Sequence, residues 1–139
     1  MNKRFYLDTC IWRDYLENRS DRFRPLGEWA FQLLKKMIQE QDIVIISDHL
    51  VTELRNIAPS EEHLKNALAI IPPSLRLKYE LTVEQFDEAR SLSAKTRLHL
   101  SDAIHAVIAN HCNAIFVSRD KHFQAIGSYV TVKKPEELI

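Results

Sequence analysis

Short apolar runs that alternate with longer amphipathic stretches constrain the fold of this chain more than any other feature of its sequence. Residues 43–46 read IVII, and a strand without a polar position is typical of a sheet covered on both faces. Similar runs are RFYL at 4–7, a short edge strand LRLKY at 75–79, AIFV at 114–117 and VTV at 130–132. Because helical patterns separate the runs, the sequence predicts an α/β domain with a mostly parallel, five-stranded sheet.

The helices between these runs are predicted from apolar residues that recur at three- and four-residue spacing. They cover 11–18, 25–41, 48–58, 61–71, 83–95 and 100–111, with a short last helix from Pro135. Thr82 and Gln85 have the spacing of a capping box. Ser101 is expected to cap the helix at 100–111, and Asp102 then lies in its first turn, near the positive end of the helix dipole.

Length and composition indicate an ordinary globular protein with one domain over residues 1–139. Apolar residues make up 45% of the chain. No run approaches the roughly 20 residues that span a bilayer, and no apolar leader follows the N-terminus. We therefore expect a cytoplasmic protein without a membrane segment, in which Cys10 and Cys112 remain reduced thiols.

Charge and glycine content exclude two kinds of nucleotide-binding protein. The 19 basic and 19 acidic side chains give a formal net charge of zero, so the whole protein has no basic field for nucleic acid. The chain has two glycines, Gly27 and Gly127, which rules out a glycine-rich loop that cradles phosphate. Local basic patches remain compatible with this composition.

Four acids stand near the ends of predicted strands or in neighbouring helices. Asp8 directly follows the run at 4–7, and Asp120 closely follows the run at 114–117. Glu53 lies in the helix after the second strand, and Asp102 opens the helix before the fourth. Sites in parallel sheets form at the carboxyl ends of strands, where Asp8 and Asp120 are expected. Each acid also has a structural interpretation, as a helix cap, a first-turn acid or a solvated helix acid, and a cap can also be a metal ligand.

Convergence of the four acids would call for a cation. Carboxylates held close together repel each other, and a hard cation such as Mg²⁺ or Mn²⁺, which prefers oxygen ligands, removes that penalty. Such a centre suits cleavage of phosphodiester bonds, because the metal polarises the phosphoryl oxygen and activates water. The sequence contains no HExxH or Cys/His zinc motif and no GxSxG nucleophile elbow. His105, one turn after Asp102, is interpreted as a core or supporting histidine.

Four segments in order, FYLDTCIW, SDHLVTELRN, LSDAIHAVIAN and AIFVSRDKHF, resemble the PIN domain family, in particular the small single-domain VapC-like ribonuclease toxins. The resemblance covers nearly the whole chain. It implies a three-layer α/β/α sandwich and a ribonuclease that depends on Mg²⁺ or Mn²⁺. It also implies a homodimer and neutralisation by an antitoxin protein.

The same resemblance assigns roles to individual residues. The family's acids map onto Asp8, Glu53, Asp102 and Asp120 as catalytic residues and metal ligands, with Glu53 acting directly or through water. Thr9 and Ser118 would help to hold the acids and metal waters. Two features differ from the usual toxin pattern: the polar stretch TCIWRDYLENR after the first acid, and His122 where an acid is common.

Basic residues near the acids are candidates for RNA binding, and single-stranded RNA is the expected form. They are Arg13, Arg55, Arg97, Arg119 and Lys121. The alternative for each is a solvated charged surface. Trp12 either stacks on a base or packs in the core or a dimer interface.

Two other functions stay open at this point. One is a catalytically weak or inactive PIN-fold module that binds RNA or a protein partner. The other is a phosphotransfer receiver domain, which would need an acid pair in or before the first loop, whereas Asp8 stands alone in DTCIW.

Overall fold

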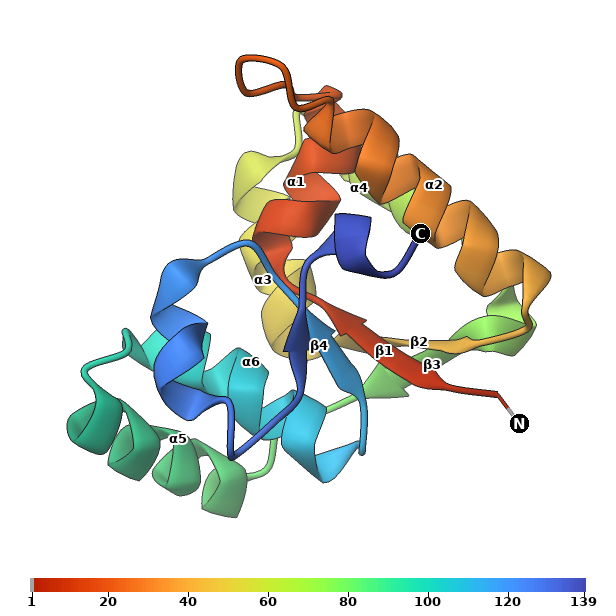
Figure 1. The fold of residues 1–139 in the computed structure, drawn as a ribbon. Helices are drawn as coiled ribbons and strands as arrows, with labels where there is room; N and C mark the ends of the chain where they lie inside the picture. The colour runs from red at the N-terminus through yellow and green to blue at the C-terminus, as the bar shows by residue number, and fades with distance from the viewer. Residues whose placement is uncertain (1) are drawn as a thin grey trace.

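The computed structural model describes residues 2–139, and these residues form a five-stranded, all-parallel sheet in the order β3-β2-β1-β4-β5 (Figure 1). The strands are β1 (Arg4–Leu7), β2 (Ile43–Ser47), β3 (Arg76–Tyr79), β4 (Ile115–Val117) and β5 (Val132–Lys133). Adjacent strands pair in parallel throughout. The predicted α/β fold with a five-stranded sheet is confirmed, and β3 lies at an edge as expected.

Helices cover both faces of the sheet (Figure 1). The chain runs from β1 to β2 to β3 through α1 (Thr9–Glu17), α2 (Leu26–Gln39), α3 (Asp48–Ile57) and α4 (Glu61–Leu68). It then returns across the sheet from β3 to β4 through α5 (Val83–Thr96) and α6 (Leu100–His111). Because parallel crossovers are right-handed, this reversal puts α5 and α6 on the opposite face and produces the α/β/α sandwich.

The core lies on both faces of the central strands. Tyr6, Val44, Ile45 and Phe116 are fully buried, which explains why residues 43–46 contain no polar side chain. In α6, every residue of the segment 103–109 is buried. The apolar body of α6 therefore fixes the start of that helix, where Asp102 lies, relative to the sheet.

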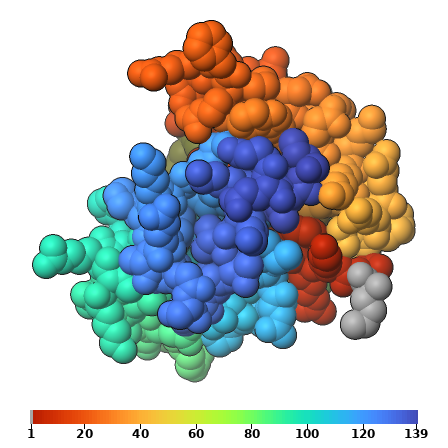
Figure 2. Space-filling model, viewed as in Figure 1, coloured from red at the N-terminus to blue at the C-terminus, as the bar shows by residue number. Residues whose placement is uncertain are grey.

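Three short 3₁₀ helices complete the described structure: η1 (Pro73–Leu75), η2 (Lys121–Ile126) and η3 (Pro135–Glu137). The segment between α1 and α2 projects from the surface (Figure 2) and carries Phe23, which is 99% exposed. No helix among residues 2–139 has the length and apolar character needed to cross a membrane.

Several boundaries differ from the sequence predictions. Ser101 does not cap α6: the N-cap is His99, which makes no side-chain capping bond, and Ser101 lies inside the helix. The helix predicted over 61–71 ends at Leu68, because the consecutive prolines 72 and 73 disfavour helical backbone before them. The fifth strand is shifted from 130–132 to Val132–Lys133 by its pairing with β4.

Other local predictions are confirmed. Thr82 and Gln85 form both hydrogen bonds of the capping box at the start of α5. Trp12 is completely buried, so its core interpretation holds and its indole is not a stacking surface for RNA. Cys10 and Cys112 are both free thiols.

Candidate metal centre

A cleft of about 410 Å³ opens at the carboxyl ends of β1 and β4, where the strand order reverses. Such a reversal is the usual place for a binding site in a parallel sheet. The cleft brings together all four predicted acids, Asp8, Glu53, Asp102 and Asp120. Its other lining residues are Thr9, Cys10, Arg13, Arg19, Ile57 and Arg119.

Asp8 is held rigidly between β1 and β4. It caps α1, and its Oδ1 accepts a hydrogen bond from the Thr9 N–H at 2.8 Å. Its Oδ2 accepts from the Ser118 hydroxyl at 2.8 Å and from the Cys10 thiol at 3.4 Å. Burial and the neighbouring Asp8 raise the pKa of the Cys10 thiol, so Cys10 stays a neutral donor instead of a thiolate nucleophile.

Ser118 also links Asp8 to the loop that carries Asp120. Its Oγ accepts a hydrogen bond from the Asp120 N–H at 3.1 Å. Asp120 caps η2 by accepting from the His122 N–H at 2.9 Å, as the sequence interpretation of Asp120 as a cap predicted. The imidazole Nδ1 of His122 lies 2.9 Å from Asp120 Oδ1, so His122 approaches this acid directly.

Asp102 faces the other two aspartates without a partner of its own. It lies in the first turn of α6, and among the described residues no donor forms a hydrogen bond with its carboxylate. Burial raises its pKa, and the charges of Asp8 and Asp120 raise it further. The three aspartates are therefore close enough to repel one another.

Glu53 belongs to a separate hydrogen-bond network on the α3 side of the cleft. Its Oε1 accepts from the Thr9 hydroxyl at 2.5 Å and lies 2.5 Å from Nε2 of His105. Its Oε2 accepts from the Ser101 hydroxyl at 2.5 Å. Burial alone would raise the pKa of Glu53, but His105, with the two hydroxyls, outweighs it and lowers the pKa to about 2.

A row of hydrogen-bonded polar groups in the core holds this network in place. His105 is 1% exposed, and its Nδ1 lies 2.6 Å from the hydroxyl of Tyr6, which lies 2.7 Å from that of Ser47. His105 is therefore a buried histidine that supports Glu53, in agreement with its interpretation from the sequence. The sequence analysis did not identify Tyr6 or Ser47, because their positions in strands gave no sign of a polar partner on α6.

His49 and Ser101 also lie beside Glu53, and neither was predicted from the sequence to do so. Nε2 of His49 lies 2.8 Å from Oγ of Ser101 and 3.8 Å from Oε2 of Glu53. Burial and the neighbouring His105 lower the pKa of His49. The i, i+4 spacing of His49 and Glu53 on α3 was the one signal in the sequence that placed the two side chains on one helix face.

The arginines of the cleft pair with acids outside the aspartate cluster. Arg19 and Arg119 both bind Asp14, whose side chain is 1% exposed, and Arg119 also binds Glu136. Arg119 is 13% exposed, and its guanidinium lies 5.4 Å from the ring centroid of Trp29. Arg13 pairs with Glu17 on the surface of α1.

The remaining basic candidates lie outside the cleft lining. Arg55 forms a two-bond pair with Glu61, and Arg97 is an exposed residue at the end of α5 with left-handed backbone. Lys121 is exposed and follows Asp120 in η2. The structure thus brings Arg13 and Arg119 to the acids and leaves Arg55, Arg97 and Lys121 outside the cleft lining.

The potential metal ligands of the cleft suit a hard divalent cation. Asp8, Asp102 and Asp120 supply oxygen ligands only, which suits Mg²⁺ or Mn²⁺. None of the arginines that line the cleft pairs with these three aspartates. Burial, and after it the charges of Asp8 and Asp120, raise the pKa of Asp102, and a bound cation would relieve the repulsion among these carboxylates.

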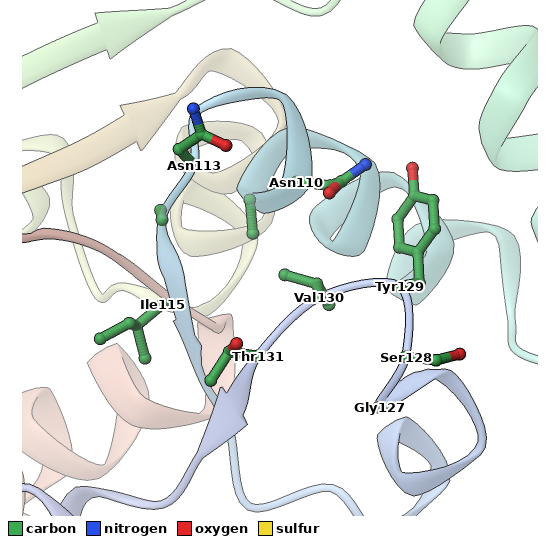
Figure 3. Close-up of a pocket in the computed structure, with 10 residues that line it drawn as sticks. Asn110, Asn113, Ile115, Gly127, Ser128, Tyr129, Val130 and Thr131 are labelled. Carbon is green, nitrogen blue, oxygen red and sulfur yellow. The ribbon is translucent and has the colours of Figure 1, made fainter.

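A second hollow, of about 290 Å³, lies at the opposite end of β4 between the end of α6 and the segment before β5 (Figure 3). Asn110, Asn113, Ser128, Tyr129 and Thr131 supply its polar groups. None of its lining residues is a carboxylate, a lysine, an arginine, a cysteine or a histidine, so it offers no ligand set for a metal.

Comparisons with known proteins agree with this geometry. The family model described as PIN domain matches residues 5–128. No curated protein sequence matches the chain. Among solved structures, VapBC2 from Rickettsia felis, bound to a promoter DNA fragment, has a TM-score of 0.69 at 16% identity, covering 94% of this chain and 98% of that one.

Two further structures are similar to the same extent. A toxin–antitoxin complex from Klebsiella pneumoniae has a TM-score of 0.69 at 20% identity and covers 94% of this chain and 97% of that one. VapC20 of Mycobacterium tuberculosis, a toxin that cleaves the sarcin–ricin loop, has a TM-score of 0.67 at 18% identity, covering 93% and 98%. At these identities the likeness establishes the fold.

Proposed function

Because this chain belongs to the PIN domain family, we propose that it is a Mg²⁺- or Mn²⁺-dependent endoribonuclease and the toxin of a toxin–antitoxin pair. One observation carries the proposal. Asp8, Asp102 and Asp120 come from three different elements, line one cleft, and pair with none of its arginines. A bound cation supplies Lewis-acid activation of the phosphate and of water.

The acids divide into two groups by their hydrogen bonds. Asp8, Asp102 and Asp120 would bind the metal directly, and Ser118 orients Asp8 and the loop of Asp120. Glu53 is held by Thr9, Ser101 and His105, and its pKa of about 2 keeps it ionised. A carboxylate fixed in this way is suited to orient the attacking water or to bind the cation through water.

Arginines at the rim of the cleft would contact the RNA phosphates. Arg13 lines the cleft and its side chain is 44% exposed, so it can exchange its surface partner Glu17 for a phosphate at little cost. Arg119 is mostly buried between Asp14 and Glu136, and its main effect would be on the electrostatic potential of the cleft. Arg55, Arg97 and Lys121 are proposed as outer contacts.

The proposed partners are an antitoxin and a second copy of the chain. Solved structures with this fold include VapBC and other toxin–antitoxin complexes, which supports a partner antitoxin for this protein. The proposed location is the cytoplasm, where Cys10 and Cys112 would stay free thiols. Sedimentation velocity of the purified protein, alone and with the product of a neighbouring small gene, tests both assemblies.

The catalytic proposal is tested by single substitutions in the aspartate cluster. Asp8→Asn and Asp102→Asn should each abolish Mn²⁺-dependent cleavage of RNA and weaken Mn²⁺ binding in calorimetry, while circular dichroism stays unchanged. Glu84→Gln is the matched control, because Glu84 is also a first-turn helix acid but lies outside the cleft. It should retain full activity.

Cleavage that persists undiminished in EDTA would overturn the proposal, as would full activity of Asp102→Asn. Absence of specific Mn²⁺ binding together with tight binding of a protein partner would instead favour the non-catalytic module.

A further inference from the structure

Three side chains beside the aspartate cluster form a second group of potential metal ligands. His49 and Glu53 lie one turn apart on α3, and His105 faces them from α6. One ligand atom from each lies within 4.8 Å of the others. Nε2 of His105 is 2.5 Å from Oε1 of Glu53, and Nε2 of His49 is 3.8 Å from its Oε2.

We propose that His49, Glu53 and His105 form a binding site for a transition-metal ion of the Zn²⁺ type, distinct from the aspartate cluster. Two imidazoles and one carboxylate are a common set of three protein ligands for zinc. Imidazole nitrogen favours Zn²⁺ over Mg²⁺, which prefers oxygen. The two sites therefore differ in ligand chemistry, and Glu53 is the one residue of the histidine site that also lines the cleft of the aspartates.

The surroundings of His105 match those of a metal-binding histidine. Such a histidine usually uses one ring nitrogen for the metal while the other is held by a fixed hydrogen-bond partner. Here Nδ1 of His105 lies 2.6 Å from the Tyr6 hydroxyl, which is itself held by Ser47 at 2.7 Å. Nε2 is thereby directed toward Glu53 and His49, and the ring is 1% exposed and packed against Tyr6 and Phe116.

The site is open on the side that faces the cleft. The side chains of His49 and Glu53 are 23% and 30% exposed, and Glu53 lines the cleft. An ion can therefore enter from solvent, and water can take the fourth position of a tetrahedral site. Binding would replace the hydrogen bond between Nε2 of His105 and Oε1 of Glu53, so these two side chains must move apart, while the core fixes the two helices that carry all three ligands.

Zinc binding has a consequence for activity that rests on the proposed function. Glu53 is shared, because it faces the aspartate cluster in the cleft and also provides the carboxylate of the histidine site. An ion held by the two histidines would occupy Glu53 and keep it from orienting water. Zn²⁺ is therefore expected to inhibit Mn²⁺-dependent cleavage.

The binding test uses the full-length, metal-free protein and Zn²⁺ alone, measured by calorimetry and by competition with a chromophoric chelator. We expect one equivalent of Zn²⁺ to bind. His49→Ala should weaken the affinity more than about tenfold, and Tyr6→Phe, which leaves all three ligands in place, should weaken it by about tenfold.

Two control variants separate this site from its neighbours in the cleft. Asp102→Asn removes a carboxylate of the aspartate cluster, and Cys10→Ala removes the thiol beside Asp8. Both should leave the Zn²⁺ affinity within about threefold of the original, which is less than the effect of removing a hydrogen-bond partner from a metal-binding histidine. Circular dichroism of each variant checks that it is folded.

The proposal is overturned if no stoichiometric Zn²⁺ binding occurs, if His49→Ala binds as tightly as the original protein, or if Asp102→Asn or Cys10→Ala loses the binding. Its failure is distinguishable from failure of the proposed function. Zinc binding without any Mn²⁺-dependent cleavage supports the histidine site alone, whereas cleavage without zinc binding leaves the ribonuclease and removes the histidine site.

Discussion

At the scale of single residues, the four acids of the cleft have different environments despite their similar chemistry. Glu53 accepts hydrogen bonds from two hydroxyls and contacts His105, whereas Asp102 has two aspartates as neighbours. The pKa of Glu53 is accordingly lowered and that of Asp102 raised. Under the proposed function, these opposite shifts fit two roles, with Glu53 held in place by its donors and Asp102 a ligand of the cation.

Removal of the Asp102 charge should stabilise the protein when metal is absent. A folded-state pKa above the ordinary value means that the ionised form of Asp102 destabilises the fold at neutral pH. Asp102→Asn should therefore raise the free energy of unfolding in EDTA by roughly 1 kcal/mol and Tm by about 3 °C. Thermal unfolding measures this, and excess Mn²⁺ should stabilise only the original protein. A lower Tm for the variant in EDTA would contradict the repulsion inferred for the cluster.

The lowered pKa of Glu53 predicts a specific dependence of stability on pH. Its pKa falls from 4.5 to about 2 on folding, so its contribution is fully present above about pH 4.5 and is lost as the pH falls toward 2. The difference in unfolding free energy between the original protein and Glu53→Gln should shrink over this interval. Urea unfolding at a series of pH values measures it. A difference that does not change with pH would show that Glu53 is not stabilised by its donors.

At the scale of elements, the junction between α1 and α2 depends on a glycine. Gly27 is the second residue of α2 and lies where the backbone at the end of α1 passes close by, and its N–H donates to the carbonyl of Arg19 at 2.8 Å. A Cβ at this position would lie 2.5 Å from Cα of Asn18 and 2.7 Å from the Asp14 carbonyl oxygen. Backbone atoms cannot move aside as a flexible side chain can, so the close approach of the helices requires glycine here.

The two glycines of the chain provide a matched pair of substitutions. Gly27→Ala should lower the free energy of unfolding by about 3 kcal/mol, as expected for overpacking against fixed atoms. Gly127→Ala should change it by less than about 0.5 kcal/mol. Gly127 has right-handed backbone, and its nearest neighbour to an added Cβ is the Gln124 carbonyl oxygen at 3.7 Å. Denaturant unfolding of both variants tests the contrast, and equal effects would contradict it.

At the scale of the whole molecule, zero net charge and a paired set of cleft arginines limit the electrostatic attraction of RNA. Under the proposed function, RNA recognition would depend on a few local contacts near the acids. This distinguishes the protein from nucleic-acid binders that use a broad basic surface.

The salt dependence of RNA binding measures how many such contacts exist. If the proposed contacts Arg13, Arg55, Arg97 and Lys121 each neutralise one phosphate, the logarithm of the affinity for single-stranded RNA should fall with the logarithm of salt concentration with a slope of about −3. Fluorescence anisotropy with Asp102→Asn, which binds without cleaving, gives this slope. A slope steeper than about −5 would indicate a wide basic surface. A slope near zero would exclude phosphate contacts.

The order of strands and helices was predictable because each depends on residues close in sequence. The apolar run at 43–46 marks a doubly covered strand, and the Thr82–Gln85 capping box marks the start of α5. Boundaries that depend on distant partners were less predictable. The fifth strand begins where β4 offers hydrogen-bonding groups, and Ser101 turns toward Glu53 instead of capping its own helix.

The sequence by itself determined the alternation of strands and helices, the four acids at their ends, and the family to which the chain belongs. Only the tertiary structure decided that these acids meet in one cleft, that Glu53 binds to His105 and Ser101, and that Arg119 is engaged by Asp14. The physical reason is the distance along the sequence over which each interaction acts. Periodicity and capping act over a few residues, whereas positions 8, 53, 102 and 120 come together only when the strand order reverses and buried helices fix both sides of the sheet.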